Sequence, residues 1–155
     1  SRALVLTSDF VTGGVSAINL TTRAVSADVA VAHSDARARW GFGRLYVLNR
    51  YLADNLQVLD AATYATLRQF SLGNGANPSD IVVVSPTKAY VSLYGTPFLQ
   101  IVNPDAGTLG PTINLSAFAD ADGPVLSRAG LGASTGSFPV ALFPVRGPLL
   151  SRAGR

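Results

Sequence analysis

His33, Ser34 and Asp35 are the residue types of a hydrolase triad, and they follow one another at the single histidine of the chain. Neighbouring residues of an extended chain point to opposite faces, whereas a working triad needs its base between the nucleophile and the orienting residue. We therefore expect a solvated turn before a strand here, and the sequence predicts no catalytic residue.

Two later stretches contain letters of ligand-binding loops. FADADG (118–123) supplies Asp120, Asp122 and Gly123, which resemble the start of a calcium loop but lack further oxygen ligands and a following Glu. Asp122 lies 42 residues after Asp80, which favours a repeated turn before a strand. GLGASTG (130–136) has no following Lys and no helix pattern behind it, so we expect flexible chain rather than a phosphate loop.

The composition leaves little for a metal or a nucleic acid to bind. One His and no Cys or Glu leave only scattered aspartates as ligands, so we expect no metal and no cofactor. Residues 1–123 have a net charge of −1, and the excess of Arg lies in residues 124–155. A folded nucleic-acid binder needs a basic face. Arg37, Arg39 and Trp40 form the one basic and aromatic cluster, and an exposed strand or loop explains it more simply than a base-stacking or carbohydrate platform.

The elements around these residues are short apolar runs separated by turns. In residues 44–86, LYVLN (45–49) and LQVLD (56–60) have strand character and flank a turn with Ala53, Asp54 and Asn55. TLRQFSL (66–72) follows, and after the breakers of 73–78 comes IVVVS (81–85). This last run is uniformly apolar, which predicts a deep strand buried on both faces beside three shallower ones.

The pattern recurs along the chain. Residues 3–8 lie over 44–49 and 88–93 at spacings of 41 and 44, and residues 15–19 lie over 56–60 and 99–103 at spacings of 41 and 43. Each member of the second set ends on Asn or Asp, which caps the turn that follows. A period of about 40 to 45 residues with four strands predicts an all-β incomplete β-propeller of antiparallel four-stranded repeats, about two and a half blades long.

The chain resembles the YVTN-type propeller repeats of secreted and cell-surface bacterial proteins, from residue 3 to about 123. The resemblance lies in LYVLN, then LQVLD, then a loop with Asn77 and Pro78. AHSDARARWGFG (32–43) departs from that pattern, which puts a deep strand there in doubt.

The first residues predict a hairpin and a third strand. Gly13 and Gly14 suit a tight two-residue turn, and residues 24–31 suit a strand with Val25, Ala27, Val29 and Val31 on one face. Asn19 and Asn114 begin glycosylation sequons, but an Asn that ends a strand already has a role in the turn.

We divide the chain into repeat units of about 3–43, 44–87 and 88–123, followed by an irregular tail, 124–155. The tail is rich in Gly, Pro and Arg and has no acid, so it resembles a truncation or a change of reading frame. Without an initiator Met or a signal peptide, the sequence suggests a piece of a longer protein or a processed product. An open arc of blades exposes strand edges, so we expect self-association.

Two function classes remain. The first is a non-enzymatic scaffold or binding module of a secreted, periplasmic or cell-surface propeller, with a protein or glycan partner at one loop face and neither nucleic acid nor a membrane span. The second is a fragment of a lactonase-like or quinoprotein-like propeller enzyme. Asp35, Asp80 and Asp122 stand before the expected inner strands with small neighbours, which favours turn capping and the first class.

Overall fold

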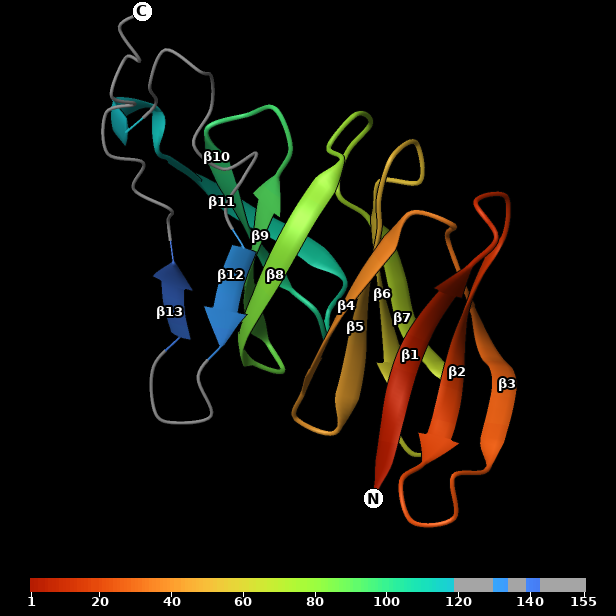
Figure 1. Cartoon of the computed structure of the whole chain (residues 1–155). Helices are drawn as coiled ribbons and strands as arrows, with labels where there is room; N and C mark the ends of the chain where they lie inside the picture. The colour runs from red at the N-terminus through yellow and green to blue at the C-terminus, as the bar shows by residue number, and fades with distance from the viewer. Residues whose placement is uncertain (119–129, 134–138, 143–155) are drawn as a thin grey trace, which may run out of the picture.

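The structure, a computed structural model, describes residues 1–118, 130–133 and 139–142. Three antiparallel sheets follow one another along the chain and stand side by side (Figure 1). The first sheet contains β1 (Arg2–Ser8), β2 (Gly13–Asn19) and β3 (Val25–Ala32). The second contains β4 (Ala36–Gly41), β5 (Arg44–Asn49), β6 (Asn55–Asp60) and β7 (Thr66–Ser71). The third contains β8 (Pro78–Ser85), β9 (Lys88–Leu93), β10 (Phe98–Asn103) and β11 (Thr108–Asn114).

Three short elements complete the described chain. A 3-10 turn, η1 (Ser116–Phe118), follows the third sheet, and β12 (Gly130–Ala133) pairs with β13 (Pro139–Leu142) beside β8 (Figure 1). The prediction of flexible chain at 130–133 was therefore wrong. Asp120, Asp122 and Gly123 lie outside the described residues. The described part of the chain includes no helix with the length and hydropathy to cross a bilayer.

The same turn follows the penultimate strand of each of the three larger sheets, after β2, β6 and β10. Asn19, Asp60 and Asn103 end these strands, and each side-chain oxygen accepts N–H groups two or three residues further on. A residue with positive φ closes each turn, and these residues are Arg23, Tyr64 and Gly107. The strands β1, β5 and β9 are thus equivalent, and the predicted repeat and its turn caps are confirmed.

The first match in that repeat is displaced by one residue from its predicted register. Arg2, not Ala3, corresponds to Arg44, because both guanidinium groups reach the turn of the next sheet. Arg2 donates to the Tyr64 hydroxyl at 2.5 Å, and Arg44 forms an ion pair with Asp105. Since residues 3–6 are all apolar, no pattern in the sequence could reveal a slip that exchanges the two faces of the strand.

Each sheet buries its apolar side chains against the neighbouring sheets. One cluster joins the first and second sheets through Leu4, Val15 and Val47, and another joins the second and third through Tyr46 and Ile81. This arrangement makes the middle strands the deepest, because both of their faces are covered.

The expectation that 81–85 is the deep strand holds for only half of its length. Ile81 and Val82 are buried, but Val84 is 41% exposed, whereas Val47 and Leu48 in β5 are fully buried. β8 also pairs with β9, so this run opens the third sheet rather than closing the second.

Two local expectations in the first half of the chain need correction. The hairpin turn lies at residues 9–12, and Gly13 and Gly14 belong to β2. A Cβ on Gly13 would lie 2.4 Å from the His33 carbonyl oxygen, so this glycine permits close approach rather than a turn. In β3, Val25 and Val31 are exposed while Val29 packs on the core, and a bulge with positive φ at Asp28 breaks the alternation between Val25 and Val29.

The stretch that departs from the repeat pattern nevertheless forms a strand. β4 pairs with β5 over its whole length and takes the place that β8 has beside β9. Ala36 and Ala38 pack on the cluster between the first and second sheets, but no residue of β4 is fully buried, so the doubt about a deep strand here is confirmed.

Candidate functional site

β4 and β8 are the first strands of their sheets, and in a propeller such strands surround the central channel. A catalytic or ligand-binding cluster of the channel would therefore stand near their starts. Asp35 and Asp80 are the residues that the sequence places there, and it favours a turn-capping role for both over a catalytic one.

Asp35 and its neighbours are committed to the connection before β4. The Asp35 carboxylate pairs with Arg50 at 3.2 Å, and its backbone N–H donates to His33 Nδ1 at 3.1 Å. The His33 N–H donates to the Asn49 side-chain oxygen at 2.8 Å. The His33 Nδ1 atom thus accepts a hydrogen bond within its own turn, and the Asp35 carboxylate pairs with Arg50. His33, Ser34 and Asp35 therefore do not form a hydrolytic triad.

Asp80 fastens the third sheet to the second. Its side chain is 1% exposed, and Oδ2 lies 2.7 Å from Arg39 Nη2. Its Oδ1 accepts the Ile81 N–H at 2.8 Å. The Asp80 N–H donates to the Ser92 hydroxyl at 3.0 Å, which ties this residue to β9 as well.

The predicted basic cluster also belongs to this contact between the second and third sheets. Arg37 donates to the Ser79 carbonyl at 3.3 Å, Arg39 holds Asp80, and Arg50 donates to the Pro78 carbonyl at 3.1 Å. These arginines therefore bind the start of β8. Trp40 does not join them, because successive residues of β4 point to opposite faces, and Trp40 is 69% exposed.

Asp54 is a structural carboxylate whose long-range contacts could not be predicted from the sequence. The predicted turn is present, with the Ala53 N–H donating to the Arg50 carbonyl at 2.8 Å. The Asp54 carboxylate extends further and accepts the Gly75 N–H at 2.8 Å and the Asn77 N–H at 2.7 Å. It therefore holds the loop that delivers β8. No local pattern signals a contact across more than twenty residues.

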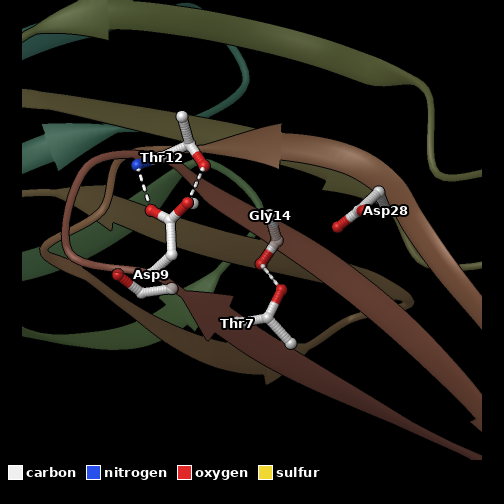
Figure 2. Close-up of a pocket in the computed structure, with 7 residues that line it drawn as sticks. Thr7, Asp9, Thr12, Gly14 and Asp28 are labelled. Atoms are coloured by element: carbon white, nitrogen blue, oxygen red, sulfur yellow. Dashed lines mark hydrogen bonds between the residues drawn. The ribbon is translucent and has the colours of Figure 1, made fainter.

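A polar pocket of about 270 Å³ lies at one end of the first sheet. Figure 2 shows Thr12 donating to Asp9, Thr7 donating to the Gly14 carbonyl, and Asp28 directed toward Gly14. The Thr12 and Val11 N–H groups lower the pKa of Asp9 below its usual value. The Asp9 carboxylate therefore accepts its hydrogen bonds from its own turn, at Val11 and Thr12.

The second sheet shows what fills the equivalent of this pocket. Asn49 and Asn55 stand at the places of Thr7 and Gly14, and the Asn49 side chain donates to Asn55 at 2.9 Å. The Asn49 oxygen accepts the N–H of His33 from the connection with the preceding sheet. The pocket is therefore the place where a preceding blade and its connection would pack.

A larger groove of about 680 Å³ lies between the first and second sheets. Its lining includes Arg2, Leu4, Ala38, Trp40 and Leu45. The sequence identified Trp40 but gave no sign of this groove, because its lining residues Leu4 and Ala38 are 34 residues apart.

The two glycosylation sequons and the possible metal ligands are the remaining sites that the sequence raised. Asn19 and Asn114 are exposed, and each oxygen accepts a backbone N–H of the following turn, from Thr21 and Ser116 respectively. Within the described ranges, no group of three or more His, Cys, Asp or Glu could hold a metal ion.

No protein-family description matches the chain, and no curated protein matches its sequence. Among solved structures, it is similar to hydrazine synthase of Kuenenia stuttgartiensis, with 20% identity and a TM-score of 0.50 over 72% of this chain and 35% of that one. It is similar to a europium-containing methanol dehydrogenase, with 15% identity and a TM-score of 0.50 over 73% of this chain and 23% of that one. The dihydro-heme d1 dehydrogenase NirN has 9% identity and a TM-score of 0.48 over 72% of this chain and 27% of that one.

The chain therefore spans about a third of these proteins or less. Hydrazine synthase and the methanol dehydrogenase are β-propeller proteins, and identities this low show the fold alone. The sheets described here are consecutive propeller blades, fewer than the roughly four to eight of a closed ring. This confirms the predicted incomplete β-propeller.

Proposed function

We propose that the chain is a segment of a non-enzymatic propeller that serves as a scaffold or binding module. The observation that carries this proposal is the use of the inner-strand carboxylates. Asp35 pairs with Arg50, and the buried Asp80 pairs with Arg39 across two sheets. The Asp80 carboxylate joins two blades and is therefore not available as an acid, base or ligand, while Asp35 is held by Arg50 within the second blade.

The resemblance to YVTN-type repeats supports a place for the parent protein in the secreted, periplasmic or cell-surface compartment. A partner protein or glycan would bind one loop face, because loops carried by a rigid scaffold are the usual recognition elements. Membership of the YVTN family, the location and the partner are parts of the same proposal.

The alternative is a segment of a lactonase-like or quinoprotein-like propeller enzyme whose active site is incomplete in this chain. The shared fold with hydrazine synthase and methanol dehydrogenase is compatible with it. Under this alternative, Asp80 would be a functional group that is retained at the expense of stability.

Thermal unfolding of Asp80→Asn separates the two proposals. If the carboxylate holds the sheets together, its loss removes charge-assisted hydrogen bonds worth about 2 kcal/mol, which lowers the Tm by roughly 4–8 °C. Asp28→Asn is the matched control, because Asp28 is exposed and Asn tolerates its positive φ. An unchanged or higher Tm for Asp80→Asn would favour the enzyme alternative.

A further inference from the structure

The connection between the second and third sheets contains the one Asn–Gly pair of the chain, Asn74 and Gly75. Asn74 is exposed, and the pair forms the middle of a turn in which the Ala76 N–H donates to the Gly73 carbonyl at 3.2 Å. An Asn that precedes Gly closes to a succinimide most readily, because glycine has no side chain to hinder its own nitrogen. Every other Asn of the chain precedes Leu, Arg or Pro, which slow or prevent this ring closure.

The Gly75 backbone nitrogen is the nucleophile of this reaction. A base removes its proton, the nitrogen attacks Asn74 Cγ to form a new C–N bond, and the side-chain nitrogen takes up a proton from water and leaves as ammonia. Water then opens the succinimide at either carbonyl, which gives aspartate or isoaspartate. Isoaspartate has one additional methylene in the backbone. The reaction is fast only where the Gly75 N–H can lose its proton and turn toward Asn74.

The structure blocks this attack with a buried carboxylate. The Gly75 N–H donates to Asp54 Oδ2 at 2.8 Å, and Asp54 is 7% exposed. A negative charge beside an N–H disfavours the loss of its proton. The electron pair left by that proton would point along the same hydrogen bond, toward Asp54 and away from Asn74. Asp54 Oδ1 also accepts the Asn77 N–H at 2.7 Å, so the carboxylate holds this short connection at two places.

The carboxylate and the reactive pair occur together in the second blade. At the spacing of 41 that relates the first two blades, Gly13 stands at the place of Asp54. The connection that follows the first sheet, 33–35, reads HSD and has no Asn–Gly pair. The second blade thus has a carboxylate where it has a reactive pair, and the first blade has neither.

We propose that Asn74 and Gly75 form a site of succinimide formation and deamidation that Asp54 keeps closed in the folded chain. Local opening of the connection breaks the Asp54 hydrogen bonds and frees the nucleophile. The added methylene of isoaspartate then displaces Gly75 from Asp54, so the modification makes the opening permanent. This inference concerns the connection alone and holds whether the parent propeller is a scaffold or an enzyme.

The test measures the deamidation rate of Asn74 in the full chain at mildly alkaline pH, by peptide mapping and mass spectrometry. A capped peptide with the sequence of residues 72–78, LGNGANP, gives the rate of the unrestrained pair. We expect the folded chain to react at least roughly tenfold more slowly than the peptide, because a hydrogen bond to a charged acceptor must break first. Asp54→Ala should raise the rate by a similar factor.

Asp80→Asn is the matched control, because it weakens the contact between the same two sheets and leaves the Gly75 hydrogen bond in place. Its rate at Asn74 should equal that of the unaltered chain. Circular dichroism establishes that each variant is folded during the incubation. If Asp54→Ala does not fold, Asp54→Asn replaces it, since Asn tolerates the φ of 48° and offers Gly75 a neutral acceptor at most. It too should react faster than the unaltered chain.

Three results would overturn the proposal. The first is an equal rate in the folded chain and in the peptide, since the fold would then give no protection. The second is an unchanged rate in the folded Asp54 variant. The third is an equal increase in Asp80→Asn and in the Asp54 variant, since general loosening of the two sheets would then control the reaction.

Discussion

Replacement of Asp54 tests whether one buried carboxylate holds the connection between two blades. Asp54 is 7% exposed, and its two oxygens accept the Gly75 and Asn77 N–H groups at 2.8 and 2.7 Å. Its own backbone has a φ of 48°, a conformation that Asp and Asn tolerate better than Ala. Asp54→Ala therefore removes both hydrogen bonds and adds backbone strain.

The two hydrogen bonds determine the size of the effect. A hydrogen bond to a charged group contributes about 1.5–3 kcal/mol net, and a left-handed Ala costs about 1 kcal/mol more. Gly75 is exposed, so water replaces part of its lost bond. We expect Asp54→Ala to lower the free energy of unfolding by about 4 kcal/mol, with about 2 from the Asn77 bond, about 1 from the part of the Gly75 bond that water does not replace and about 1 from the backbone. Asp54→Asn keeps one acceptor and the backbone conformation, so it should lose roughly half as much.

Urea unfolding followed by circular dichroism measures the global loss, and amide hydrogen exchange measures the local one. The Gly75 and Asn77 amides should exchange faster in Asp54→Ala than amides of the first sheet. Asp28→Asn again serves as the control for loss of a carboxylate. If Asp54→Ala is destabilised while exchange at Gly75 and Asn77 is unchanged, the carboxylate does not hold this loop and the reasoning is refuted.

Three further predictions concern packing, pH and assembly. Gly13→Ala should lower the Tm because its Cβ meets the backbone of His33, whereas Gly41→Ala, with nothing within 4 Å, should leave the Tm unchanged. The Thr63 and Ala62 N–H groups lower the pKa of Asp60 in the folded state, so its stabilising contribution is present above the unfolded pKa of about 4 and is lost as the pH falls through the folded value. Urea midpoints should therefore decline in acid, and less steeply in Asp60→Asn. The chain should self-associate in light scattering through the outer face of the first sheet, and Val5→Glu should reduce the association without a change in Trp40 emission; a monodisperse monomer at high concentration would contradict this.

The sequence predicted those parts of the fold that repeat with a chemical signature. Asn19, Asp60 and Asn103 cap equivalent turns because an amide or carboxylate oxygen is needed at that place in every blade. The register of β1 could not be predicted, since it depends on which of two apolar faces meets the next sheet. The hydrogen bonds of Asp54 could not be predicted either, because they join residues far apart in the chain.

The candidate site required the structure for a similar reason. Asp35, Arg37, Arg39 and Asp80 have the residue types of catalytic or binding groups, and only their partners show that each one joins neighbouring strands or sheets. The sequence correctly separated His33, Ser34 and Asp35 from triad chemistry, because that argument needed only the geometry of adjacent residues.

Equivalence between blades offers a way to separate interface from function in a repeat fold. Val47 is fully buried against the first sheet, whereas Val5, its counterpart one blade earlier, is 38% exposed. The pocket beside Asp9 and Asp28 has a counterpart that Asn49, Asn55 and the connection from a preceding sheet fill. A hollow or an apolar patch on the first sheet thus has an interface role wherever its counterpart is filled by a neighbouring blade. By the same test, a side chain is a functional candidate when the equivalent position in another blade has no structural contact that accounts for it. Loops that bind a partner at one face must carry such side chains.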